Sequence, residues 1–131
     1  MNMNNYTIKS QEAIQRSQEI AAGNQHQAIE NVHLLKSMIK VDENVVPFLL
    51  RKFNVDMKVF SEALDRIIGS MPKVNGGEQY LSEDASKTLQ KANGYLSEFG
   101  DEFVSIEHIF LGILSANDTA AKLLKDNGIN D

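Results

Sequence analysis

Residues 103–114 read Phe-Val-Ser-Ile-Glu-His-Ile-Phe-Leu-Gly-Ile-Leu, and eight of these twelve residues are apolar. A helix that is apolar nearly all round belongs inside a domain, because a surface helix needs a polar face. Ser105 is a suitable N-cap for such a helix, since its hydroxyl can accept a backbone N–H that has no helical partner. Glu107 then lies near the positive end of the helix dipole. We therefore expect a central, buried helix that starts near Ser105.

A weaker copy of this segment occurs at residues 28–39, where His33 takes the place of His108, 75 residues later. Sliding the chain by 75 residues aligns the two halves without a gap and places Thr7 on Ser82. Few residues are identical, so the repeat is inferred from matched helix caps and apolar positions. We predict a single domain, 1–131, made of two pseudo-symmetric four-helix repeats, about 6–71 and 81–131, joined by a mobile surface loop at 72–80. No sequence for an eighth helix follows Asp131, which indicates that the chain was cut from a longer protein.

The composition predicts a globular domain and narrows the possible partners. The chain has 131 residues, 42% of them hydrophobic, a formal net charge of -5 and no cysteine. These values argue against a nucleic-acid surface, and they exclude disulfides and thiolate chemistry. The first residues do not resemble a secretory signal, and no apolar run approaches the roughly 18 residues that span a bilayer. We expect a cytoplasmic protein that binds neither nucleic acid nor membrane.

Helical spacing and caps place the elements, and no strand pattern interrupts them, so the predicted fold class is all-α. The first helix runs from its cap Thr7 to about Ala22, and the copy of the central helix covers about 31–39. The expected caps of the other helices are Asp42, Asp56, Ser82 and Asp118. The third helix carries Val45, Val46, Phe48, Leu49 and Phe53. The fourth buries Met57, Phe60, Ala63, Leu64, Ile67 and Met71, and the fifth, to about Phe99, turns Ala85, Leu89, Ala92, Tyr95, Leu96 and Phe99 inward.

Four segments together resemble the Clp N-terminal repeat domain over essentially the whole chain. They are Thr7-Ile-Lys-Ser-Gln-Glu-Ala-Ile-Gln, His33-Leu-Leu, Pro72-Lys-Val-Asn-Gly-Gly and Gly100-Asp-Glu-Phe-Val-Ser-Ile-Glu-His-Ile-Phe-Leu-Gly-Ile-Leu. The loop and the Tyr-Leu-Ser opening of the second repeat are most similar to those of bacterial ClpB-type AAA+ disaggregases. The resemblance implies a domain that captures unfolded or aggregated polypeptides for threading through a hexameric AAA+ ring, in a chaperone that works with an Hsp70-type system.

The resemblance also implies that this domain is a binding module and not an enzyme. The chain has no Gly-x-x-x-x-Gly-Lys-Ser/Thr phosphate loop, so ATP and Mg would be bound by modules outside it. We expect no cofactor and no metal in the domain itself. The alternative is an adaptor- or tag-binding N-domain of a Clp unfoldase that is associated with a protease.

Three site residues follow from the resemblance and two from the residues alone. ClpB-type relatives imply substrate-handling roles for Thr7, Asp101 and Glu107. In ClpC-type relatives the glutamate before each histidine serves a phosphoarginine site; Glu107 keeps that position, but Val32 replaces it in the first repeat. An apolar groove is expected along the seam of the repeats, and Leu89 and Phe110 are its candidate lining.

Each candidate also has a purely structural interpretation. Thr7 can be a helix cap, Asp101 a turn residue and Glu107 a partner of the helix dipole. His33 and His108 are better explained as buried, hydrogen-bonded residues than as metal ligands, and His26 is expected to be an exposed loop residue. A hydrolytic set of Ser105, His108 and Asp101 lacks a nucleophile elbow and an oxyanion loop. A hydrolase that uses Glu107 and His108 would show turnover by the isolated domain.

Overall fold

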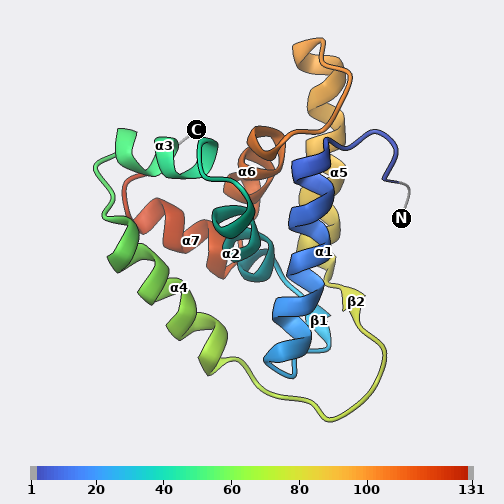
Figure 1. Cartoon of the computed structure of the whole chain (residues 1–131), viewed down its shortest axis with the longest axis vertical. Helices are drawn as coiled ribbons and strands as arrows, with labels where there is room; N and C mark the ends of the chain where they lie inside the picture. The colour runs from blue at the N-terminus through green and yellow to red at the C-terminus, as the bar shows by residue number, and fades with distance from the viewer. Residues whose placement is uncertain (1–2, 130–131) are drawn as a thin grey trace.

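The computed structural model describes residues 3–129, which form seven helices and two very short strands (Figure 1). The predicted all-α fold class is confirmed, although the two strands were not expected. In chain order the elements are α1 (Ile8–Gly23), β1 (Ala28–Ile29), α2 (Asn31–Val41), α3 (Val45–Lys52), α4 (Met57–Ser70), β2 (Tyr80–Leu81), α5 (Glu83–Phe99), α6 (Ile106–Ser115) and α7 (Thr119–Asp126).

The helices begin where side chains can accept the free N–H groups of a first turn. Thr7 accepts from the Ser10 amide at 3.1 Å, and Ser82 accepts from the Ala85 amide at the same distance. Asp56 and Asp118 cap α4 and α7 in the same way. Asp42 caps α3 from two residues before the N-cap position. Its carboxylate accepts hydrogen bonds from the backbone amides of residues 44, 45 and 46.

The two repeats are joined by two short parallel backbone pairings, each between one residue of the first repeat and one of the second. Ile29 of β1 pairs with Leu81 of β2, and Tyr6 pairs with Val104 in an isolated bridge. A shift of 75 residues converts one pair into the other. The next amides follow the same rule, because Thr7 donates to the Val104 carbonyl and Ser82 donates to the Ile29 carbonyl, each at 3.0 Å. Each repeat therefore holds the start of the other, as pseudo-twofold symmetry requires.

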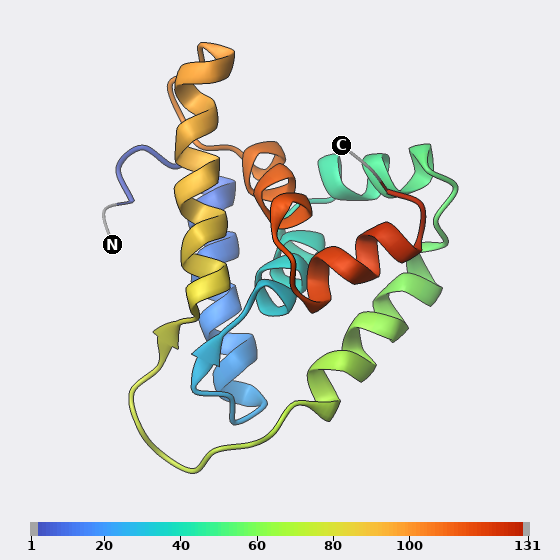
Figure 2. The same cartoon turned by 180° about the vertical axis from the view of Figure 1, so that it is seen from behind.

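The central helices α2 and α6 lie between α1 and α5 on one side and α4 and α7 on the other (Figures 1 and 2). Between residues 3 and 129 the second repeat has three helices, α5 to α7. We propose repeat limits of about 6–71 and 81–131, joined by 72–80.

Helices α5 and α6 approach each other closely where they cross. A Cβ at Gly112 would lie 2.7 Å from the Thr88 carbonyl oxygen, so only glycine permits this approach. At the matching place in the first repeat, the Ser37 hydroxyl donates to the Ala13 carbonyl at 2.7 Å. Ile109 and Ile113 of α6 are fully buried, which confirms the predicted position of this helix inside the domain.

One of the aromatic side chains predicted from helix periodicity to face inward lies at the surface. Phe99 is 53% exposed, because the last turns of α5 project beyond the other helices (Figure 1). Phe48 and Phe53, which the sequence assigned to the third helix without a facing direction, are also exposed; α3 buries Val46 and Leu50. On α4 the fully buried residues are Phe60, Leu64 and Ile68, while Ala63 and the outer members of the predicted stripe, Met57, Ile67 and Met71, are half-buried. Helical period alone does not tell how far a neighbouring helix extends.

The connection between the repeats runs over the surface and is fixed at several points. The Val74 amide donates to the Gln25 carbonyl at 2.8 Å, and the Tyr80 amide donates to the Gln27 carbonyl at 3.1 Å. The Gln79 side chain adds a hydrogen bond to the His26 carbonyl at 3.3 Å. Over residues 3–129, no helix has the length and apolar character needed to cross a membrane.

Candidate functional site

The structure brings two of the predicted site residues, Asp101 and Glu107, together in one surface pocket. The pocket has a volume of about 440 Å³ and lies between the end of α5 and the start of α6. We call it the α5–α6 pocket. Its lining residues are Phe99, Asp101, Glu102, Phe103, Ser105, Glu107, His108 and Leu111.

The wall of the α5–α6 pocket is fixed by the way the chain leaves α5. Gly100 ends the helix in the left-handed conformation, with φ of 70°, which costs glycine little. The turn aims Asp101 back at α6, where its Oδ2 lies 2.9 Å from His108 Nε2. The Ser105 amide donates to His108 Nδ1 at 2.8 Å. Because Nδ1 accepts that bond, a neutral His108 carries its proton on Nε2 and donates it to Asp101.

The α5–α6 pocket combines exposed aromatic rings with negative charge. Phe99 and Phe103 are 53% and 49% exposed, and the Phe99 ring stacks on His108 with centroids 6.2 Å apart. Among the lining residues there are three carboxylates and no lysine or arginine. This surface can contact an apolar segment through its rings and a positive or polar group through its rim.

The other predicted site residues lie outside the lining of this pocket. Thr7 caps α1 and is joined through its amide to Val104, which lies between two lining residues. Leu89 and Phe110 are each 3% exposed and belong to the hydrophobic core. Their predicted position along an open groove is therefore not what the structure shows, because helix packing covers both side chains.

The matching part of the first repeat is built differently. His26, predicted to be exposed, is only 4% exposed, because it packs against His33 in the place that Asp101 takes against His108. The prediction for His33 and His108 is confirmed, since both are buried and hydrogen-bonded. Val32, in the position that matches Glu107, is 3% exposed and offers no charge.

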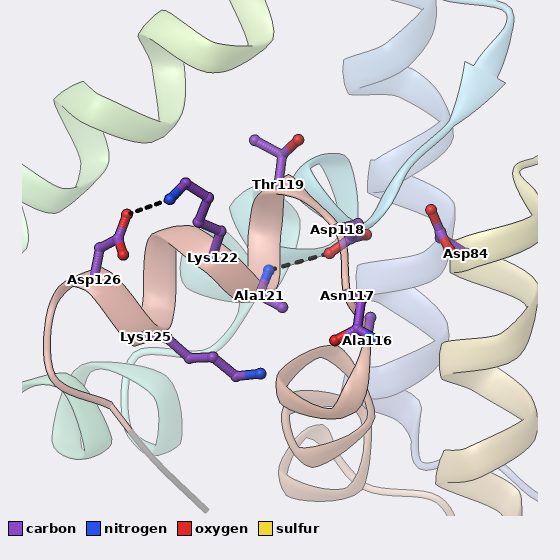
Figure 3. Close-up of a pocket in the computed structure, with 9 residues that line it drawn as sticks. All are labelled: Asp84, Ala116, Asn117, Asp118, Thr119, Ala121, Lys122, Lys125 and Asp126. Carbon is purple, nitrogen blue, oxygen red and sulfur yellow. Dashed lines mark hydrogen bonds and ion pairs between the residues drawn. The ribbon is translucent and has the colours of Figure 1, made fainter.

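A second, larger pocket lies within the second repeat, between the start of α5 and helix α7, and five of its nine lining residues are charged (Figure 3). We call it the α7 pocket; its volume is about 650 Å³. Figure 3 shows Asp84 entering from α5, while Lys122 and Asp126 of α7 form an ion pair at 3.6 Å. A smaller hollow of about 190 Å³ beside it has the apolar residues Val32, Ile67, Met71 and Ala120 in its wall. The predicted apolar groove is thus reduced to this hollow.

Sequence reasoning did not identify the two phenylalanines as site residues. Phe99 follows the inward-facing spacing of α5, and Phe103 stands in a run that leads into the buried helix. The available signal was their place on either side of Gly100-Asp101, a turn in which bulky apolar residues have little to pack against. Within residues 3–129, no group of three or more His, Asp or Glu side chains is arranged to hold a metal ion.

Comparison with known families gives one match that covers most of the chain. Residues 5–127 match the model of the Clp repeat (R) N-terminal domain. The chain is 45% identical over 131 residues to the chaperone protein ClpB of Bacteroides thetaiotaomicron and 42% identical over 131 residues to that of Porphyromonas gingivalis. All of this chain is aligned in both cases, but it spans only 15% of the length of each relative.

Solved structures share the fold at much lower identity. The Hsp104 N-terminal domain from Candida albicans aligns with a TM-score of 0.86 and 21% identity, covering 97% of this chain and 84% of that one. The N-terminal domain of the ClpV1 ATPase from E. coli aligns with a TM-score of 0.83 and 16% identity, covering 95% and 77%. At these identities the likeness establishes the fold alone.

Proposed function

Because the chain belongs to the Clp repeat N-terminal domain family, we propose that it is the client-binding domain of an ATP-dependent, ClpB-type protein disaggregase. In this proposal the domain binds exposed apolar segments of unfolded or aggregated proteins. AAA+ modules in the longer protein then thread those segments through a hexameric ring. The domain itself binds and does not catalyse.

The observation that carries the proposal is the pair of exposed phenylalanines in the α5–α6 pocket. An unfolded client offers apolar side chains in no fixed order, so its receptor needs open apolar surface more than a closed, specific cavity. Phe99, in the last turn of α5, and Phe103, in the turn that follows it, supply that surface; the end of α5 projects beyond the other helices (Figure 1). Asp101 and Glu107 flank it and keep it hydrated when no client is bound.

Such a site would bind weakly, and weak binding suits the proposed role. Two exposed rings and a shallow pocket bury far less area than a stable protein interface of roughly 1,600 Å². A domain tethered above a ring raises the local concentration of a client without holding it tightly. A tight complex would compete with the motor that pulls the client away.

The remaining features of the proposed protein lie outside this chain. We propose that ATP and Mg are bound by its AAA+ modules, that it cooperates with an Hsp70-type chaperone system, and that it acts in the cytoplasm. The names of the two ClpB relatives support this proposal, since each describes a chaperone.

An NMR titration of residues 1–131 with a permanently unfolded protein tests the proposal. We expect shift changes at Phe99, Asp101, Phe103 and Glu107, with an affinity in the micromolar range or weaker. The reference positions are Phe48, which is 57% exposed on α3, and Val59, which is 57% exposed on α4; neither lines the α5–α6 pocket. Equal changes at the reference positions would indicate non-specific contact, and a flat titration would reject client capture by this domain.

A second candidate is docking of a folded adaptor, and the α7 pocket favours it. Its mixed charges, with Asp84, Lys122 and Lys125 in the wall, resemble the polar rim of an interface between folded proteins. This function predicts binding to one folded partner and little binding to denatured clients. Shift changes confined to α7 in the same titration, made with a folded partner, would support it.

A further inference from the structure

The two repeats hold their central histidines in the same way but with different partners. In the first repeat, His26 Nδ1 lies 2.9 Å from His33 Nε2. In the second, Asp101 Oδ2 lies 2.9 Å from His108 Nε2. His26 and Asp101 occupy matching positions under the 75-residue shift. One repeat therefore has a pair of histidines where the other has an aspartate and a histidine.

The hydrogen bonds fix where the protons of the histidine pair are. The Glu30 amide donates to His33 Nδ1 at 2.8 Å, so that nitrogen carries no proton. A neutral His33 then has its proton on Nε2 and donates it to His26 Nδ1. His26 in turn carries its proton on Nε2, and that buried N–H has no partner within the described residues.

This arrangement leaves no place for another proton. The two acceptor nitrogens of the pair, His33 Nδ1 and His26 Nδ1, already accept N–H donors. An added proton must therefore break one of these hydrogen bonds. In the second repeat a proton on His108 Nδ1 would likewise displace the Ser105 amide, but the Asp101 carboxylate faces Nε2 and balances the charge of the protonated ring.

The histidine pair lies beneath the contacts that join the two repeats. The connection between the repeats bonds to the carbonyls of residues 25, 26, 27 and 29, which surround His26 in the chain. The amides of Tyr80 and Ser82 belong to this set, with Gln27 and Ile29 as their acceptors. Displacement of His26 would loosen these bonds together.

We propose that the His26–His33 pair is an acid-sensitive latch that holds residues 74–82 against the first repeat, while Asp101–His108 is its acid-stable counterpart. Protonation of the pair separates the rings and opens the strand pair β1–β2. The matching bridge between Tyr6 and Val104 stays closed.

The charged groups nearest the pair, Lys36 and Glu30, act in opposite directions. Lys36, one turn after His33, disfavours a second positive charge, although its ammonium is 2.7 Å from Asp65 of α4. Glu30 contributes the backbone amide that occupies Nδ1, while its carboxylate accepts from the His33 amide and favours a positive charge on the ring. The inter-repeat connection reaches His26 through the neutral amide of Gln79. Burial, His26 and Lys36 together lower the pKa of His33 to about 4.

Amide hydrogen exchange between pH 7.5 and pH 5.0 tests the latch with an internal control. Ser82 and Thr7 donate to matching carbonyls in the two repeats, each at 3.0 Å. After correction for intrinsic exchange, we expect the protection of the Ser82 and Tyr80 amides to fall by about tenfold relative to Thr7 when the pH is lowered. The reason is that the histidine pair binds a proton more readily in the open state than in the closed state. Equal changes at Ser82 and Thr7 would overturn the proposal.

Exchanging the partners between the repeats gives a second, reciprocal test. His26→Asp copies the second repeat and should remove the acid sensitivity at Ser82. Asp101→His copies the first repeat and should make Thr7 acid-sensitive. If His26→Asp does not fold, the wild-type comparison and Asp101→His still decide the question. Acid sensitivity at Ser82 that persists in folded His26→Asp would contradict the latch.

Discussion

Asp101 holds His108 at the edge of the α5–α6 pocket, with 2.9 Å between the carboxylate Oδ2 and the ring Nε2. The contact joins the turn after α5 to the first turn of α6. It also fixes the ring on which Phe99 stacks. A residue first suggested by family resemblance thus has a structural task beside any contact with a client.

Two substitutions at Asp101 separate these roles. Asp101→Ala removes the acceptor for His108 and should reduce the free energy of unfolding by about 1 kcal/mol. Asp101→Asn keeps an acceptor oxygen and should cost less than half as much. If the charge contacts clients, both variants weaken binding equally. If Asp101 only positions His108, Asp101→Asn binds like the wild type, as urea unfolding and client titration on the same samples would reveal.

Thr7 can be tested in a similar way, because its hydroxyl caps α1. Thr7→Ala should cost about 1 kcal/mol of stability, and Thr7→Ser should retain most of it. Urea denaturation measures both. Weaker client binding in Thr7→Ala at a temperature where the variant is fully folded, restored in Thr7→Ser, would assign the hydroxyl a binding role. Unchanged stability in Thr7→Ala would contradict the capping contact.

Gly112 is predicted to be intolerant of any side chain. A methyl group there would meet the Thr88 carbonyl oxygen at 2.7 Å, so Gly112→Ala should force α5 and α6 apart at a cost of about 1–3 kcal/mol. Gly94 is the matched control, because it lies inside α5 with nothing within 4 Å of an added Cβ. Gly94→Ala should stabilise the domain by about 0.5–1 kcal/mol. Equal effects of the two substitutions on unfolding in urea would refute the close crossing.

His33 should remain neutral at pH values where an ordinary histidine is charged. Burial, together with His26 and Lys36, lowers the pKa of its ring to about 4, from 6.5. A group whose pKa is lower in the folded state contributes stability above its unfolded pKa and loses that contribution as the pH falls. Stability should therefore decline from about pH 6.5 toward pH 4. An NMR titration of the imidazole signals tests this, and a midpoint near 6.5 for His33 would contradict the structure.

The sequence was sufficient to predict the helices, because the determinants of a helix are local. Thr7, Asp56, Ser82 and Asp118 precede apolar stripes at helical spacing, and each caps its helix in the structure. The burial of α6 followed from its composition, since a helix without a polar face has to be covered.

The positions of Phe99 and His26 depended on distant parts of the chain and were predicted wrongly. Phe99 is exposed because the end of α5 extends beyond the helices packed against it. His26 is buried because its ring packs against His33. The second case could have been found from the repeat: the 75-residue shift places His26 on Asp101, so a residue near the central histidine in one repeat has a counterpart near it in the other. The strand pairing between the repeats is a tertiary feature that two-residue strands do not reveal in sequence.

Client affinity of a variant with both exposed phenylalanines replaced tests the central claim most directly. Phe99→Ser with Phe103→Ser should leave stability within about 1 kcal/mol, because both rings are half exposed, and should weaken binding of an unfolded protein about tenfold or more. Phe48→Ser, which removes a ring of 57% exposure outside the α5–α6 pocket, should bind like the wild type. Calorimetric titration of all three proteins gives the answer. Unchanged affinity in the double variant, or an equal loss in Phe48→Ser, would contradict client capture at the α5–α6 pocket.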